Sequence, residues 1–299
     1  MIYVQEVVTR DGFQNEGHFV PTNKKIELIN KLSKVGLNKI EVTSFVSPKA
    51  VPNLRDAEEV MDGINRNPNI TYSALVPNLI GARRAVECEV DEINLLVSAS
   101  NTHNLKNVNY TTEQTFEKFN EIIDYLSNKK ISINGSLGTS FGCPFEGQIP
   151  AEHILNLIEK YFELGVFNIT LADTTGMAIP NQVYNLCTKI INEFPTINIT
   201  LHFHNTRGMG LANVLEGIRA GINRFDSSLG GLGGCPFAPG ATGNICTEDL
   251  VHMLYFMGYK MTVNLDKLVN VAKYLQEIIP WELDGQVIKS GKITDLHPR

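Results

Sequence analysis

The chain has 299 residues, of which 43% are apolar and 19% charged, a composition typical of a globular protein and unlike that of a disordered one. No apolar run approaches the ~20 residues that cross a bilayer, so we expect no membrane association. The formal net charge of −6 argues against a protein whose main partner is nucleic acid.

Eight short runs rich in β-branched and apolar residues predict strands, and helical patterns separate most of them. The first run begins directly after Met1 and leaves no room for a signal peptide, so we expect a cytoplasmic protein. The eight runs lie near residues 2–8, 38–43, 70–76, 92–98, 131–139, 167–173, 198–204 and 224–229.

Two helices are predicted most clearly. Apolar residues recur at helical spacing over residues 26–35, with Thr22 as the expected N-cap and Gly36 as the stop. A similar pattern starts at Pro150 and stops at Gly165. Each of these helices is followed by a glycine and then by a strand.

The junctions between helix and strand repeat along the chain. Residues 36–41, 165–170 and 221–226 share one pattern, in which a glycine ends a helix and a strand follows at once. Repeated units of this kind favour parallel strands, and eight of them predict an α/β protein, a (β/α)₈ TIM barrel. An open doubly wound sheet is the alternative, but no glycine-rich dinucleotide motif follows the first strand.

The barrel is expected to be the only domain. We assign residues 1–279 to it as a single catalytic domain, with an extra helical segment from about Asn264 to Ile279. Residues 280–299 are predicted to form a polar C-terminal tail.

A pair of histidines marks the end of the seventh predicted strand. His202 and His204 are two residues apart, so both imidazoles point to the same face of a strand. With a carboxylate nearby, two neutral imidazoles can bind a divalent metal, and Asp11 could supply the oxygen. The alternative is a pair of hydrogen-bonded histidines that line the barrel.

Other polar side chains lie where the barrel would place its active site, at the carboxyl ends of strands. Arg10 and Asp11 follow the first strand. Taken singly, Asp11 could instead be a turn residue and Arg10 an ion-pair partner. Glu41 lies between apolar residues of the second strand and needs a partner if buried, for which Arg10 would serve. Asp173 ends the sixth strand and could instead cap the turn that follows.

A glycine-rich segment, residues 230–244, follows the eighth strand and predicts a loop that closes over a ligand. Cys235 lies in this segment without apolar neighbours, and a thiol with a pKa near ~8.5 can donate a proton at cellular pH. A free surface cysteine is the alternative. We expect Cys143, in a similar segment after the fifth strand, to shape its loop.

The remaining cysteines are interpreted as packing residues. The chain has five in all, an odd number without CxxC spacing, so neither a disulfide framework nor a zinc ribbon fits. The three packing cysteines are Cys88, Cys187 and Cys246.

Five spaced segments together resemble the hydroxymethylglutaryl-CoA lyase family. They are residues 6–16 (EVVTRDGFQNE), 40–49 (IEVTSFVSPK), 142–147 (GCPFEG), 202–204 (HFH) and 231–244 (GLGGCPFAPGATGN). The wider superfamily, with the isopropylmalate and homocitrate synthases, shares the Arg-Asp and His-x-His pairs. The cysteine loop is the feature that points to the lyases.

The resemblance implies cleavage of 3-hydroxy-3-methylglutaryl-CoA to acetoacetate and acetyl-CoA, as in leucine degradation and ketone-body formation. It implies an acyl-CoA thioester as substrate. Separately, because barrel enzymes often associate, we expect a homo-oligomer with a dimer as the first expectation, although no sequence feature fixes the number of subunits. The resemblance also implies four ligands for Mg²⁺ or Mn²⁺: Asp11, His202, His204 and Asn244.

The family's chemistry assigns a role to each remaining candidate. Arg10 would stabilise the thioester enolate and Cys235 would protonate it, after Asp11 or His202 has removed the hydroxyl proton. Glu41 and Asp173 would support the site.

The chain departs from the family pattern after the second histidine. Where the lyases typically continue Asp-Thr-Tyr-Gly-Gln, this chain has Asn205, Arg207 and Met209 at the first, third and fifth positions. Arg207 could meet an acidic substrate or a CoA phosphate, or be solvated. A lyase for another branched 3-hydroxyacyl-CoA, a Claisen-type synthase and a noncatalytic acyl-CoA-binding protein remain as alternatives.

Overall fold

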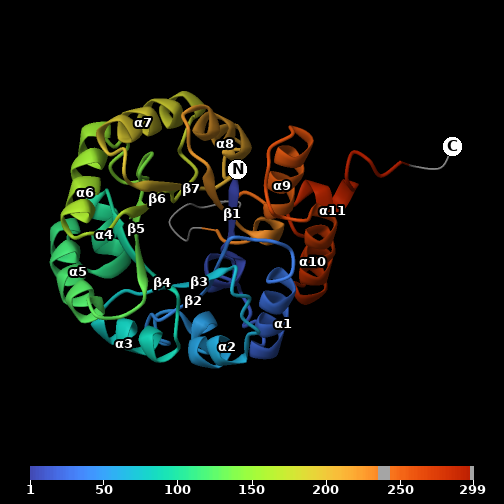
Figure 1. The fold of residues 1–299 in the computed structure, drawn as a ribbon, viewed down its shortest axis with the longest axis horizontal. Coiled ribbons are helices and arrows are strands. Elements are labelled where there is room, and N and C mark those ends of the chain that lie inside the picture. Colours follow the sequence, from blue (N-terminus) through green and yellow to red (C-terminus); the bar gives the residue numbers. More distant parts are fainter. Residues whose placement is uncertain (235–242, 297–299) are drawn as a thin grey trace.

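In the computed structural model, which describes residues 1–234 and 243–296, eight parallel strands close into a barrel in which β1 pairs with both β2 and β8. Figure 1 shows the strands inside a ring of helices. The α/β barrel prediction is confirmed, and so are all eight predicted strands. The strands are β1 (Tyr3–Glu6), β2 (Lys39–Ser44), β3 (Thr71–Leu75), β4 (Glu92–Ser98), β5 (Ser132–Gly138), β6 (Asn168–Asp173), β7 (Asn198–Phe203) and β8 (Arg224–Ser227).

Helices follow the strands in sequence and cover the outside of the barrel. One helix, α4 (Asn101–Val108), lies on the inner side of α5 (Thr112–Leu126) in Figure 1. The ring is formed by α5 together with α1 (Thr22–Leu32), α2 (Ala57–Gly63), α3 (Leu79–Glu87), α6 (Ala151–Glu163), α7 (Pro180–Glu193) and α8 (Gly210–Arg219). Beyond it, α9 (Thr247–Phe256), α10 (Leu265–Ile278) and α11 (Gln286–Ser290) lie side by side, on the right of Figure 1. Three short turns complete the described structure: η1 (Val8–Gly12), η2 (Pro52–Leu54) and η3 (Leu229–Gly231).

The three junction glycines have the conformation that their pattern predicts. Gly36, Gly165 and Gly221 have φ angles of 93°, 76° and 104°. A side chain is disfavoured in this left-handed region, so glycine lets the chain leave each helix and turn directly into the next strand.

The N-terminal end of α1 differs from the prediction. Pro21 occupies the cap position, and Thr22 is the first helical residue without capping α1. The Thr22 hydroxyl instead donates to Asp56 Oδ2 at 2.8 Å. The prediction of Thr22 as the N-cap was therefore wrong, because a partner from a distant part of the chain holds its side chain.

The barrel has an apolar outer layer and a polar interior. Alternate strand residues pack against the helices, including Ile40, Leu95 and Leu201, none of which is exposed. The residues that face inward are unusual for this fold, where branched apolar side chains normally fill the centre. Here they include Gln5, Ser73, Asn94, Asn134 and Thr170, which are buried and line the central cavity.

The segment expected to be a polar tail packs partly against the barrel. Leu283 and Val287 are buried, and the Asp284 amide donates to the Gly230 carbonyl at 3.1 Å. The first part of this segment therefore supports the loop after β8, and only its end extends away from the body in Figure 1.

Within the described ranges, no helix has both the length and the apolar character that crossing a bilayer would demand.

Two buried carboxylates connect β1, η3 and α9. Glu6 accepts hydrogen bonds from the amides of Val8 and Leu229, both at 2.9 Å, while Glu248 accepts one from the Gly230 amide at 3.0 Å. Burial raises the pKa of Glu6 to about 7 and that of Glu248 to about 8. Both side chains are therefore easiest to bury in their protonated, neutral form.

We expect Glu248→Gln to become more stable than the unmodified protein as the pH rises from 5 to 9. The folded-state pKa of Glu248 lies above its unfolded value, so its contribution is fully present below the unfolded pKa and is lost as the pH passes about 8. Glutamine stays neutral, so the difference in unfolding free energy should grow by a few kcal/mol. Urea unfolding at several pH values measures it.

The exposed Glu117 on α5 provides the control for this measurement. Its replacement by Gln should leave the pH dependence of the unfolding free energy unchanged. If the unfolding free energies of Glu248→Gln and the unmodified protein differ by the same amount at every pH, the assignment of a neutral Glu248 is contradicted.

Candidate active site

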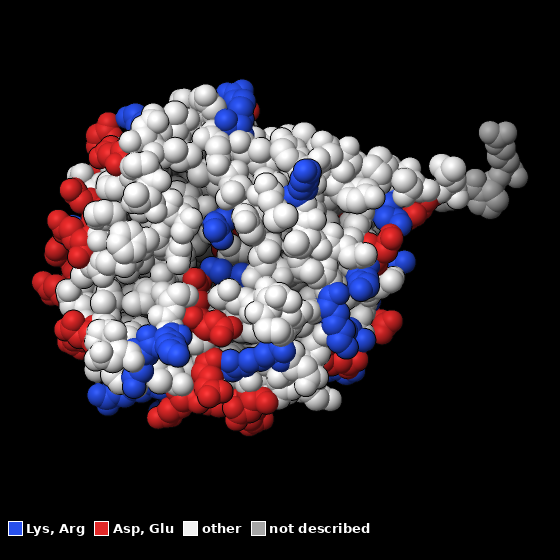
Figure 2. All heavy atoms as spheres, viewed as in Figure 1, with Lys and Arg blue, Asp and Glu red and all other residues white. Residues whose placement is uncertain are grey.

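A cavity of about 550 Å³ opens at the carboxyl ends of the strands and reaches down into the barrel. Residues of several strands line it, among them Glu41, Asn94, His202 and Asp226. Figure 2 shows a hollow near the centre of one face, with Lys or Arg atoms at its edge. This is the end of the barrel at which the fold builds its active sites.

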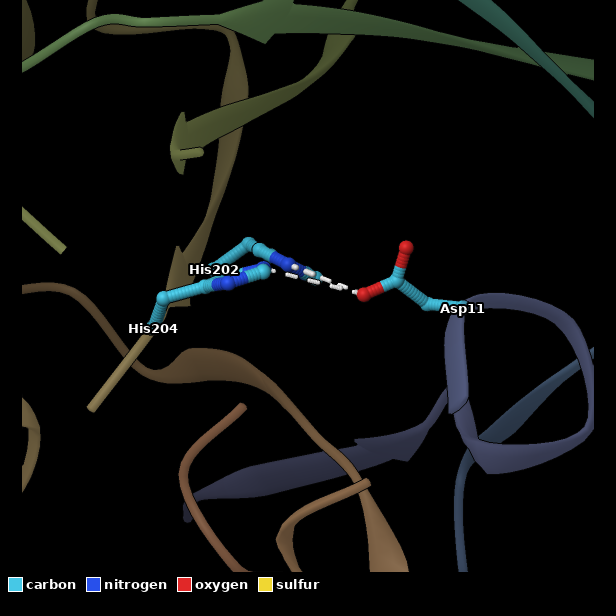
Figure 3. Close-up of side chains that lie close together, drawn as sticks. All are labelled: Asp11, His202 and His204. Carbon is cyan, nitrogen blue, oxygen red and sulfur yellow. Dashed lines mark ion pairs between the residues drawn. The ribbon is translucent and has the colours of Figure 1, made fainter. Parts of the chain in front are cut away.

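Asp11, His202 and His204 converge on one point in this cavity. Their side chains face one another in Figure 3, with the two imidazoles from the end of β7 opposite the carboxylate from η1. Asp11 Oδ2 lies 3.8 Å from His202 Nε2 and 3.7 Å from His204 Nε2. The predicted meeting of the first and seventh strands therefore occurs.

A single turn of π-helix places Arg10 and Asp11 in the cavity. After β1, the amides of Arg10, Asp11 and Gly12 all donate to the Val7 carbonyl, at 3.1, 2.7 and 3.3 Å. Turns with this wide hydrogen-bond pattern are rare and recur at functional sites.

The three converging groups fit a divalent cation. One ligand atom from each of the three lies within 4.8 Å of the others, and all three residues are buried. The gaps of 3.7 and 3.8 Å between oxygen and nitrogen are too long for hydrogen bonds and leave room between the atoms. One carboxylate with two imidazoles is also a donor set that divalent metals accept.

The electrostatics of the site keep Asp11 charged. Burial alone would raise its pKa, but Arg10 and the two histidines hold that pKa well below the usual range. Burial lowers the pKa of His204, which favours the neutral imidazole that binds metals. For His202, burial is outweighed by Asp226 and Asp11, which raise the pKa.

Arg10 links the candidate metal-binding group, which is Asp11 with the two histidines, to Glu41. Its Nη1 donates to Asp11 Oδ1 and its Nε to Glu41 Oε2, both at 2.5 Å. The expected pairing of Arg10 with the buried Glu41 is thus present in the structure. The guanidinium is fixed at two points and lines the cavity, so it can meet negative charge on a bound molecule.

Asp226 belongs to the site and was missed in the sequence. Its Oδ2 lies 3.2 Å from His202 Nδ1, so the carboxylate can orient the ring and leave Nε2 directed at Asp11. Asp226 is the last residue of the repeated segment 221–226, in which only Gly221 was assigned a role. The available signal was a carboxylate after apolar residues of a strand, the same signal that marked Glu41.

We expect Asp226→Asn to weaken divalent-metal binding by about 10- to 100-fold. The amide keeps the shape of the side chain but removes the negative charge that fixes the imidazole of His202. Electron paramagnetic resonance of Mn²⁺ measures the free ion directly and needs no substrate. The surface variant Asp266→Asn is the control, and equal Mn²⁺ affinity in the two variants would contradict the orienting role of Asp226.

Asn244 lies beside Asp11 but presents its amide nitrogen. Asn244 Nδ2 donates to Asp11 Oδ2 at 2.7 Å and to the Leu232 carbonyl at 2.9 Å. A cation would be bound by the amide oxygen, so a ligand role requires the amide to rotate.

The described ends of the glycine-rich loop pack closely together. A Cβ on Gly243 would lie 1.8 Å from the Gly231 carbonyl oxygen, and one on Gly233 would lie 2.5 Å from Asn244 Nδ2. Close approach of neighbouring chain therefore explains these two glycines, and the loop closure expected from the sequence stays a prediction. Cys235 lies outside the described residues.

Asp173 and Arg207 hold turns. Asp173 Oδ1 accepts from the amides of Met177 and Ala178, at 2.7 and 3.1 Å, which supports the turn-capping interpretation. Burial raises the pKa of Asp173 to about 6. Arg207 donates to the carbonyls of Thr175 and Gly176, so its contacts are with the chain itself.

Cys143 has the loop-shaping environment that was expected. Its Sγ lies 2.9 Å from Ser100 Oγ, and its backbone pairs with Gly147. The three cysteines interpreted as packing residues are also buried.

Comparisons with known proteins agree with the site. The family model described as HMGL-like matches residues 1–275. A hydroxymethylglutaryl-CoA lyase of Bacillus subtilis is 44% identical over 97% of this chain and 98% of that protein. The human mitochondrial hydroxymethylglutaryl-CoA lyase is 38% identical over 97% of this chain and 89% of that protein.

A solved structure is closer in sequence still. An HMG-CoA lyase from Acinetobacter baumannii, in complex with coenzyme A and 3-methylmalate, is 52% identical and superposes with a TM-score of 0.96. The match covers 100% of this chain and 98% of that one.

Proposed function

Because this chain belongs to the HMGL-like family, we propose that it cleaves 3-hydroxy-3-methylglutaryl-CoA into acetoacetate and acetyl-CoA. The observation that carries the proposal is the convergence of Asp11, His202 and His204 beside Arg10. A fold alone would not support it, since barrels host many reactions. Here the chemistry of the side chains and the names of the relatives agree.

The reaction breaks the bond between carbons 2 and 3 of the acyl chain. The 3-hydroxyl loses its proton and becomes a ketone, and the electron pair of the broken bond passes to the thioester as an enolate. A proton then adds to carbon 2 and gives acetyl-CoA. The protein must remove one proton, stabilise one negative charge and return one proton.

The residues can divide these tasks. Asp11 or His202 removes the hydroxyl proton. Arg10, fixed by Glu41 and Asp11, meets the negative charge of the enolate oxygen in a largely buried site. Asp226 orients His202, and Asp173 supports the site through the turn after β6.

The cation is proposed to be Mg²⁺ or Mn²⁺, held by Asp11, His202 and His204, with Asn244 as a fourth ligand once its amide rotates. Such an ion orients the substrate and stabilises charge that develops on oxygen.

The cavity has room for a thioester beyond the metal-binding group. It continues past α4 to Tyr110 and to Lys118 on α5, so a long substrate can extend outward from the reacting carbons. We further propose that the protein forms a homo-oligomer, with a dimer as the first expectation, and that it is cytoplasmic. The division into a domain of residues 1–279 and a tail of 280–299 stays a prediction.

Cys235 is proposed as the residue that returns the proton. We expect Cys235→Ser to cut turnover sharply while leaving Mn²⁺ affinity unchanged, because a hydroxyl is a far weaker acid than a thiol. Turnover equal to that of the unmodified protein would rule out the thiol as the donor.

The direct test incubates the purified protein with hydroxymethylglutaryl-CoA and follows acetoacetate. Activity should vanish after treatment with EDTA and return with Mg²⁺ or Mn²⁺. Parallel assays with other branched 3-hydroxyacyl-CoA thioesters, and with acetyl-CoA plus a 2-oxoacid, test for a related lyase and for a synthase. Absence of acetoacetate in the presence of metal would refute the proposed substrate.

A further inference from the structure

Asn94, on β4, makes a contact that none of the sequence motifs indicates. Its side chain is 7% exposed, and its Nδ2 lies 2.5 Å from Glu41 Oε1. The other oxygen of Glu41 accepts from Arg10 Nε. The buried carboxylate is therefore held on one side by the arginine and on the other by the amide.

Both contacts are needed to hold a charged Glu41. A buried carboxylate oxygen without a donor is costly, and Arg10 satisfies only one of the two oxygens. The amide must also direct its nitrogen toward Glu41, because two facing oxygens would repel each other unless Glu41 were protonated. The orientation of Asn94 thus matches an ionised Glu41.

We propose that Asn94 is a positioning residue, which holds the Glu41 carboxylate in the orientation that aims Arg10 into the active site. This inference rests on the proposed function. It extends the hydrogen-bonded chain from Asp11 through Arg10 and Glu41 to β4, on the inner wall of the barrel. The direction of the guanidinium is then set from two strands instead of one.

The charges around Glu41 support this role. The surroundings raise the pKa of Glu41 overall: burial raises it most, Arg10 and Asn94 lower it, and the carboxylate of Asp226 on β8 raises it. Without Asn94, only Arg10 would lower the pKa of Glu41, while burial and Asp226 would still raise it. A proton on Glu41 would then weaken the ion pair that holds the guanidinium.

The chain offers a matched control on the neighbouring strand. Asn134 on β5 is the register partner of Asn94, is also buried and also lines the cavity. Its amide donates to Thr170 Oγ1 at 3.1 Å and to Ser136 Oγ at 3.2 Å, not to a carboxylate. Replacing Asn134 therefore changes the packing of the interior without touching Glu41.

The experiment compares Asn94→Leu with Asn134→Leu in the full-length protein. Carbon-13 NMR of glutamate-labelled protein, with the Glu41 signal assigned from Glu41→Gln, gives the pKa of Glu41 without any substrate. Steady-state kinetics with hydroxymethylglutaryl-CoA gives kcat and KM across pH, and Mn²⁺ binding reports on the metal-binding group.

For Asn94→Leu we expect the pKa of Glu41 to rise by about one unit or more. We expect kcat to fall about 10- to 100-fold, with the acid limb of its pH profile moved to higher pH, while KM and Mn²⁺ affinity change little. Asn134→Leu should leave the pKa of Glu41 and the Mn²⁺ affinity as they are in the unmodified protein, since Asn134 does not contact Glu41. If the leucine variant does not fold, Asn94→Ala carries the same expected directions, since no larger side chain must be accommodated.

An unchanged pKa of Glu41 together with an unchanged kcat in the Asn94 variant would overturn the proposal. Equal rises in the pKa of Glu41 in the Asn94 and Asn134 variants would overturn it too, since they would indicate a packing effect. If the unmodified protein does not cleave hydroxymethylglutaryl-CoA, the proposed function fails. The NMR titration would then still decide whether Asn94 holds Glu41.

Discussion

Replacing Arg10 with Gln is expected to lower kcat for hydroxymethylglutaryl-CoA cleavage by roughly 10²- to 10³-fold. In the proposed mechanism the guanidinium meets the negative charge of the enolate as the bond breaks, and glutamine supplies no positive charge in its place. Arg10 stays protonated at all relevant pH values, because Glu41 and Asp11 outweigh burial and raise its pKa further. The loss should appear mainly in kcat, since the charge develops in the transition state.

Arg10→Lys should restore little of this activity. A lysine ammonium has no planar fork, so it cannot bond Glu41 and Asp11 together as Nε and Nη1 do. Arg207→Gln is the matched control, because that arginine follows β7 but donates to backbone carbonyls. Similar losses of kcat in the Arg10 and Arg207 variants would contradict a specific role for Arg10.

Replacing Asp11 with Asn is expected to weaken Mn²⁺ binding by more than about 100-fold and to remove turnover with it. Asp11 would be the one anion among the three proposed ligands, since the two histidines would bind as neutral imidazoles. Asparagine keeps the size of the side chain, so the effect reports the lost charge. Calorimetric titration of the substrate-free protein with Mn²⁺ measures it.

A neighbour of Asp11 provides the control for this measurement. Gln14, which donates to Asp11 Oδ1 at 3.0 Å, touches the carboxylate without belonging to the grouped ligands. Gln14→Leu should therefore change Mn²⁺ affinity far less than Asp11→Asn does. Unaltered Mn²⁺ affinity in Asp11→Asn would exclude Asp11 as a ligand and with it the metal centre described here.

The errors and omissions of the sequence interpretation share one cause. Thr22 carried a capping signal, but its hydroxyl donates a hydrogen bond to Asp56, 34 residues away. Asn94 carried no motif and the carboxylate of Asp226 was not interpreted, yet each contacts a residue that was singled out. The interpretation of Arg207 missed the carbonyls of the turn after β6. In every case the deciding partner lies far away in the sequence.

The sequence by itself determined the elements of this protein and the identity of its reactive groups. Strand periodicity, the glycines at helix ends and the two-residue spacing of His202 and His204 depend on local backbone geometry, which neighbouring residues fix. Tertiary structure alone decided which groups meet. Closing the barrel brings Asp11 within 4 Å of both imidazoles, and it places Asn94 and Asp226 behind Glu41 and His202. Such contacts depend on the register of parallel strands joined by long connections, which no local pattern encodes.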